Sequence, residues 1–123
     1  MEDQSTKLET AKLAKEKGFN WETRGFVNLS QDNHFDNDSL LENYNSKEHT
    51  ISIPTQSLLE RWLREVHEIH VGVKPYSCSR PENFEYEVSI LGKRYGKWVR
   101  IDSYLDYEDA MERGLEEALK LIK

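Results

Sequence analysis

The stretch PTQSLLERWLREVHEIHVGV, residues 54–73, has the densest helical apolar pattern in the chain. Its apolar residues recur at steps of three and four, the spacing of one face of an α-helix. Thr55 or Ser57 can cap the first turn, and Ser57 with Glu60 has the spacing of a capping box. The stripe consists of Leu58, Leu59, Trp62, Leu63, Val66 and Ile69. So broad an apolar face predicts a helix that packs on more than one side and forms the central element of the core.

The residues after this helix predict three strands and a final helix. Alternation from Ile69 onward predicts a strand that starts near His70, followed by a loop over Pro75 to Asn83. Residues 84–90 alternate apolar with polar side chains, which predicts a strand with one buried face. Residues 98–103 return as its partner, with Val99 and Ile101 inward, and Asp106 caps a helix that runs to Ile122. The order from residue 54 onward is therefore α-β-β-β-α.

The N-terminal part has weaker signals. Residues 5–17 predict a helix that Gly18 ends, and residues 21–29 predict one strand. Residues 31–50 are rich in Asp and Asn, which favour turns, and predict a long loop. Such a loop is functional or mobile, or it hides a short element.

Together these segments predict an α+β fold. We expect a small antiparallel sheet of three or four strands, packed against two or three helices. The length of 123 residues suits a single domain, in which residues 1–53 precede the α-β-β-β-α core of residues 54–123.

Composition limits the class of protein. The net charge of −6 disfavours general nucleic-acid binding, which normally uses a basic face. Cys78 is the one cysteine, so no intramolecular disulfide can form and a reducing compartment is expected. No run of residues resembles a signal peptide or approaches the roughly 18 apolar residues of a membrane span. We therefore expect a soluble, cytoplasmic protein without a membrane partner.

Three pieces of the chain carry a resemblance. AKLAKEKGF at residues 11–19, PTQSLLERWLREVHEIHV at 54–71 and LDYEDAMERGLEEALKLI at 105–122 resemble a family of small uncharacterised proteins. These are carried by gut bacteria and by their phages and prophages. The resemblance implies a phage-related, cytoplasmic accessory protein, and it brings no activity, cofactor or catalytic residue with it.

The order α-β-β-β-α is also similar to that of the double-stranded-RNA-binding domain. Such domains place basic residues at the start of the final helix, where they contact phosphates. Here that position holds Asp106, Tyr107, Glu108 and Asp109, which would repel a phosphate. The RNA-binding activity is therefore not carried over.

No constellation of residues predicts catalysis, a metal or a cofactor. His67 and His70 have helical metal-ligand spacing, but a helix that ends near His70 would separate the two rings. Asp32, Asp36 and Asp38 lack the glycine and the closing glutamate of a calcium-binding EF-hand. The chain contains no G-x-S-x-G motif, no glycine-rich phosphate loop and no catalytic Cys–His spacing. We expect a protein that is not an enzyme and uses no cofactor.

The sequence GKRYGKWVR, residues 92–100, is the candidate binding surface. It combines cations with aromatic residues and contains no acid, and its candidate residues are Lys93, Arg94, Tyr95, Lys97, Trp98 and Arg100. Residues 106–117, in contrast, hold six acids and one arginine. Such a basic hairpin can contact phosphates and stack on bases, bind an acidic patch of a protein, or simply be solvated. We expect a non-catalytic protein-interaction module, with a nucleic-acid-binding accessory protein as the alternative.

Overall fold

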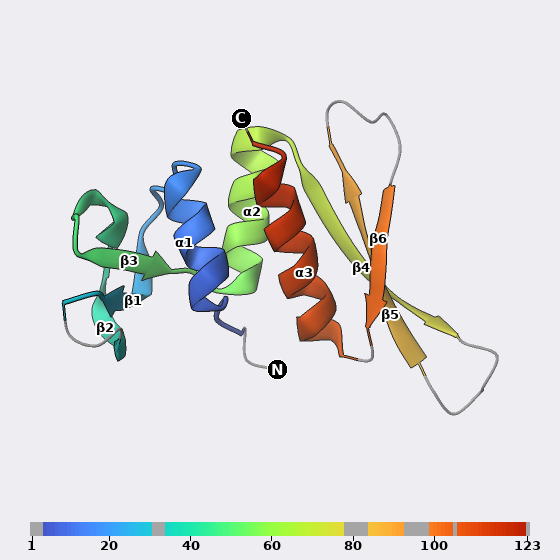
Figure 1. Ribbon diagram of the computed structural model, residues 1–123, viewed down its shortest axis with the longest axis horizontal. Helices are drawn as coiled ribbons and strands as arrows, with labels where there is room; N and C mark the ends of the chain where they lie inside the picture. Colours follow the sequence, from blue (N-terminus) through green and yellow to red (C-terminus); the bar gives the residue numbers. More distant parts are fainter. Residues whose placement is uncertain (1–3, 31–33, 78–83, 93–98, 105, 123) are drawn as a thin grey trace. The chain divides into compact units, whose positions relative to one another are not determined.

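The computed structural model describes residues 4–30, 34–77, 84–92, 99–104 and 106–122. They form an α+β fold, as predicted, in which small antiparallel sheets pack against helices (Figure 1). The chain divides into two compact units, Met1–Trp62 and Leu63–Lys123, and the boundary falls within helix α2. No helix among the described residues is long and apolar enough to span a membrane.

The first unit contains a three-stranded sheet that the sequence did not predict. Its strands are β1 (Thr23–Asn28), β2 (His34–Glu42) and β3 (Thr50–Ile53), in the order β2-β1-β3 with both pairs antiparallel. A short 3₁₀ helix, η1 (Tyr44–Ser46), connects β2 to β3. The prediction of a long loop over residues 31–50 was therefore wrong for most of that segment. Pairing with β1 outweighs the weak strand preference of its Asp and Asn residues.

Helix α1 (Leu8–Glu16) packs on this sheet, and Ala11 joins Val27, Ile51 and Ile53 in one apolar cluster. The helix ends as predicted: Gly18 has φ +95°, and the Phe19 N–H donates to the Ala14 carbonyl at 2.9 Å. It starts three residues later than predicted, because the chain before it is extended. There Ser5 bridges to Thr55.

Helix α2 (Gln56–His67) confirms the predicted helix of the deciding stretch. Thr55 is its cap, since the Thr55 hydroxyl accepts from the Leu58 N–H at 3.3 Å. Most of the apolar stripe is buried, namely Leu59, Trp62, Leu63 and Ile69, whereas Val66 is 51% exposed. Glu68, with φ 57°, follows the helix and leads into the next strand.

The second unit contains β4 (His70–Ser77), β5 (Phe84–Leu91), β6 (Val99–Tyr104) and α3 (Tyr107–Lys120). The strands form an antiparallel sheet in the order β4-β5-β6, and α3 packs against all three (Figure 1). Val88 and Ile90 are buried while Glu87 and Ser89 are half-buried, which confirms the alternation over residues 87–90. Tyr86 is half-buried, like Glu85 and Glu87. The predicted inward faces of Val99 and Ile101 concern side chains that the structure does not describe.

The end of β4 and the start of α3 can also be compared with the predictions. The loop predicted from Pro75 was wrong at its start, because β4 continues to Ser77 and Pro75 pairs with Tyr86. A proline fits there because β4 is an edge strand, where an N–H can be spared. Asp106 caps α3 as predicted: its carboxylate accepts from the Glu108 N–H at 2.9 Å.

Candidate functional site

The predicted binding surface falls largely outside the described residues. Lys93, Arg94, Tyr95, Lys97 and Trp98 all lie there, so their grouping stays a prediction. Arg100 belongs to β6, where its backbone pairs with Ser89 of β5.

The weak metal candidates are placed as follows. His67 is the last residue of α2 and His70 the first of β4, so they do not share a helix. Asp36 and Asp38 belong to β2, whereas Asp32 lies outside the described residues. Within the described part of the chain, no three His, Cys, Asp or Glu residues are grouped so that they could hold a metal ion.

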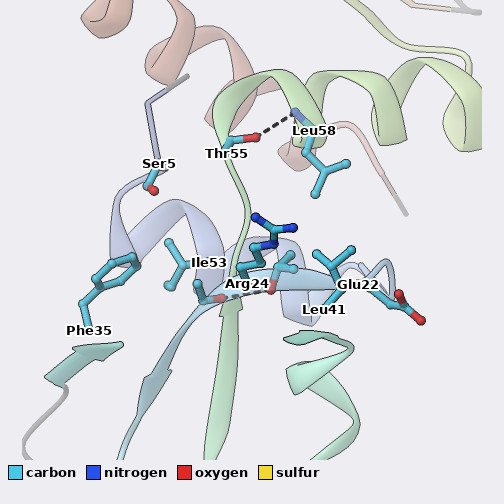
Figure 2. A pocket seen from close by; sticks show the side chains of 10 residues that line it. Ser5, Glu22, Arg24, Phe35, Leu41, Ile53, Thr55 and Leu58 are labelled. Atoms are coloured by element: carbon cyan, nitrogen blue, oxygen red, sulfur yellow. Dashed lines mark hydrogen bonds between the residues drawn. The ribbon is translucent and has the colours of Figure 1, made fainter. Parts of the chain in front are cut away.

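A cavity of about 360 Å³ lies in the first unit, between β1, the bulged part of β2 and the start of α2 (Figure 2). Its volume is at the lower end of the range of roughly 300–1,000 Å³ for small-ligand sites. The lining combines four large apolar side chains with two charged and several small polar residues. We call it the Arg24 cavity; it is lined by Ser5, Glu22, Thr23, Arg24, Gly25, Phe35, Leu41, Ile53, Thr55 and Leu58.

Gly25 makes room for the aromatic wall of this cavity. A Cβ atom at Gly25 would lie 3.0 Å from the Ile53 carbonyl oxygen and 3.1 Å from two ring carbons of Phe35. Such contacts are tighter than ordinary packing, so a side chain here would push the Phe35 ring away. The glycine thus lets the ring lie close over β1.

A bulge in β2 forms the second apolar wall. Gly25 pairs with Asn37 and Thr23 pairs with Glu42, so a two-residue step along β1 corresponds to a five-residue step along β2. The surplus residues leave the ladder, and Leu41 is among them. Leu41 is 53% exposed and Phe35 46% exposed, although both are large and apolar. The sheet therefore presents both side chains to the solvent beside one cavity.

Arg24 is the cation of the cavity. Its side chain is exposed and makes no ion pair or hydrogen bond with the described residues. Figure 2 shows it rising from β1 toward Thr55 and Leu58 in the first turn of α2, while the Glu22 carboxylate turns away from it. The positive end of the α2 dipole lies on the same side. The cavity thus places a guanidinium that has no ion pair among the described residues next to apolar walls.

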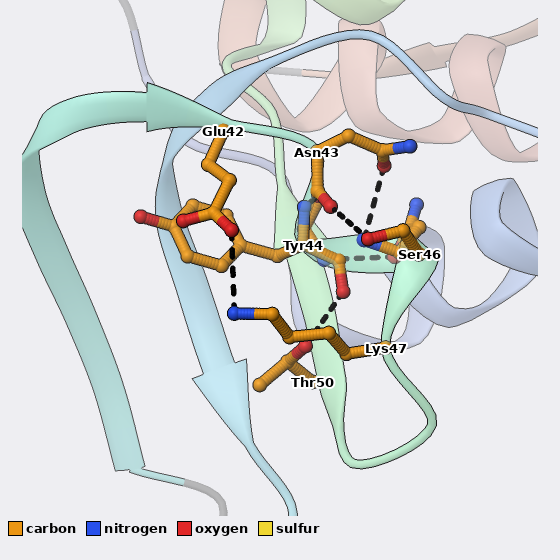
Figure 3. Close-up of polar contacts among 8 residues, drawn as sticks. Glu42, Asn43, Tyr44, Ser46, Lys47 and Thr50 are labelled. Carbon is orange, nitrogen blue, oxygen red and sulfur yellow. Dashed lines mark hydrogen bonds and ion pairs between the residues drawn. The ribbon is translucent and has the colours of Figure 1, made fainter.

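The opposite edge of the sheet is closed by polar side chains (Figure 3). The Ser52 N–H of β3 donates to the Asn45 side-chain oxygen at 2.9 Å, and the Lys15 ammonium donates to the Thr50 carbonyl at 2.8 Å. The Thr50 hydroxyl donates to the buried Tyr44 carbonyl at 2.6 Å. Two backbone groups on the outer side of β3, the Ser52 N–H and the Thr50 carbonyl, are therefore hydrogen-bonded within the unit. Strand β2 forms the other edge of the sheet.

The second unit has a shallower depression of about 270 Å³, lined by Gly72, Val73, Lys74 and Ser89. It lies on β4 and β5, where two small residues, Gly72 and Ser89, face each other across the strands. Lys74, an exposed cation, stands opposite Glu87 in the same ladder. The residues that line the depression include no aromatic side chain and no leucine, whereas Phe35 and Leu41 line the Arg24 cavity.

No protein-family model, curated protein or solved structure matches this chain.

The Arg24 cavity was not predicted from the sequence. Arg24 is one of many cations in the sequence, and Phe35 and Leu41 lie in the segment that was predicted to be a loop. Two signals were available: large apolar residues in an otherwise polar segment, and Gly25 within a strand of apolar residues.

Proposed function

We propose that this protein is a non-catalytic interaction module that binds a partner polypeptide at the Arg24 cavity. The observation that carries the proposal is the pair of exposed side chains, Phe35 and Leu41, beside Arg24, which has no ion pair or hydrogen bond among the described residues. Apolar patches with a polar rim mark interaction sites, and aromatic residues and arginine are enriched among the residues that dominate binding energy.

The chemistry of the cavity supports binding rather than catalysis. Its hydroxyl groups, on Ser5, Thr23 and Thr55, have no histidine beside them among the residues that line it. A hydroxyl nucleophile is typically activated by an adjacent general base, most often a histidine. The Thr23 hydroxyl is already engaged, since it donates to the Gly25 carbonyl at 2.9 Å. The single cysteine supports a cytoplasmic location, and the resemblance to phage-related proteins supports an accessory role there.

A peptide display selection against the full chain tests this function. We expect selected peptides to lose affinity at least about tenfold in Phe35→Ser and Leu41→Ser, which remove apolar contacts at the cavity. Leu29→Ser is the matched control, because Leu29 is 39% exposed and lies in the same unit but not at the cavity. Binding that resists both cavity variants would contradict the proposal.

The alternative function is nucleic-acid binding by residues 92–100, where four cations and two aromatic residues support it against the acidic net charge of the chain. Fluorescence anisotropy with labelled single- and double-stranded DNA and RNA at low salt separates the two functions. Binding that falls steeply with salt and is lost in Lys93→Glu with Arg94→Glu would favour the alternative. We expect no isotherm up to high micromolar protein.

A further inference from the structure

Arg24 and the apolar walls of its cavity together restrict the chemistry of a ligand. A guanidinium that leaves bulk water on binding needs an anion, and a carboxylate fits its planar donor fork best among peptide groups. Phe35, Leu41 and Leu58 require an apolar group on the same ligand. The ligand must therefore place a carboxylate and an apolar group within one small cavity of about 360 Å³.

An internal segment of an extended polypeptide meets this requirement poorly. Successive side chains of a strand point to opposite faces, and the nearest side chains on one face are about 7 Å apart. An acidic and an apolar residue of such a segment are therefore more widely separated than two groups on one Cα atom. A C-terminal residue carries its carboxylate and its side chain on the same Cα atom. It can therefore present both groups together.

Resting on the proposed function, we propose that the Arg24 cavity binds the C-terminal residue of a partner polypeptide. The terminal carboxylate pairs with the Arg24 guanidinium, and an apolar last side chain packs between Phe35, Leu41 and Leu58. The positive end of the α2 dipole adds to the attraction. Glu22 also lines the cavity, but its carboxylate points away from the guanidinium (Figure 2).

The test compares two forms of one probe. Fluorescein-labelled peptides, randomised upstream and ending in Leu, Ile, Val or Phe, are prepared with a free C-terminal carboxylate and as C-terminal amides. We expect the acids to bind at least about tenfold more tightly than the amides, because a charge-assisted pair is lost in the amide. In the Arg24→Gln variant, the affinity for the free-acid peptides should fall to the affinity for the amide peptides.

Lys12→Gln is the matched control for charge, because Lys12 is an exposed cation of α1 that does not line the cavity. It should leave the difference between acid and amide unchanged. Phe35→Ser should lower the affinities for the acid and the amide peptides by the same factor, because it removes only the apolar contact. Thermal melts of each variant establish that it is folded.

The outcomes separate this inference from the function beneath it. If acid and amide peptides bind with equal affinity, and if Phe35→Ser lowers both affinities, the C-terminal inference is overturned. The proposed interaction function would still be supported by that result. Octanoate that displaces the peptides as well as an unlabelled acid peptide does would assign the cavity to free carboxylic acids instead. Both proposals would be overturned if no peptide bound in either form and if the binders from the display selection kept their affinity in Phe35→Ser.

Discussion

The two units of this chain hold their sheets by different means. In the second unit, α3 covers the sheet with apolar side chains, and Gly114 is the residue at which the helix comes very close to the strands. A Cβ atom at Gly114 would lie 2.5 Å from a Val88 methyl and 2.6 Å from a Val71 methyl. In the first unit, polar side chains close the edge strand β3, and a cavity remains beside β2. The tight apolar packing under α3 leaves little surface for a ligand in the second unit. The first sheet retains exposed apolar side chains and a cation, Arg24, that makes no ion pair with the described residues. This difference supports the proposal that the binding site lies in the first unit.

The substitution with the largest expected effect on stability tests the apolar core of the first unit. Trp62 is 2% exposed and meets the Phe19 ring edge-on at a centroid distance of 5.2 Å. We expect Trp62→Ala to lower the free energy of unfolding by about 3–5 kcal/mol, the range for a buried large aromatic side chain. Chemical denaturation measures it. Trp21→Ala is the control, because Trp21 is only half-buried, and equal losses in both variants would contradict the burial of Trp62.

The next effect tests the close packing of the second unit. Gly114→Val inserts a branched side chain against Val71 and Val88, which are both buried and stiff. We expect the free energy of unfolding to fall by about 1–3 kcal/mol through overpacking. Peptide binding at the Arg24 cavity should persist below the melting temperature. A neutral or stabilising substitution would show that α3 does not press on these two valines.

A smaller effect tests the polar edge of the first unit. Thr50→Val keeps the shape of the side chain but removes the hydroxyl that donates to the Tyr44 carbonyl. The carbonyl keeps one long contact, from the Lys47 N–H at 3.4 Å, so we expect a loss of about 1 kcal/mol. Thr50→Ser keeps the hydroxyl and should cost less. If Ser destabilised more than Val, packing rather than the hydrogen bond would dominate at this edge.

The contrast between the units also explains what the sequence could predict. Strand β5 and helix α3 were predictable because their apolar periods of two and 3.6 agree with the packing that buries them. Strand β2 was not, because its Asp and Asn residues favour turns locally and only pairing with β1 makes it a strand. The Arg24 cavity was harder still. It brings together Ser5, Arg24, Leu41 and Leu58 from four separate segments, and no local pattern encodes such a meeting.

The smallest effect concerns the start of α3, where two exposed carboxyl groups share a hydrogen bond. The Glu108 side chain, followed by the Glu108 N–H, lowers the pKa of Asp106 below its ordinary value of 3.8. The same side-chain hydrogen bond raises the pKa of Glu108 above its ordinary 4.5. Asp106 therefore stabilises the fold above pH 3.8 and loses this contribution as pH falls through its lowered pKa. Glu108 contributes below pH 4.5 and loses its contribution as pH rises through its raised pKa.

Both contributions are therefore present between pH 3.8 and 4.5, and they are lost in opposite directions of pH. The carboxyl ¹³C shifts are followed because they report on each group separately. Asp106→Asn keeps a side-chain oxygen that can cap α3 but removes the charge that faces Glu108. We expect the Glu108 titration to move down toward its ordinary midpoint in this variant, while binding at the Arg24 cavity stays unchanged. A Glu108 midpoint that does not move would mean that the two carboxyl groups do not share a proton. The cap would then rest on the Glu108 N–H alone.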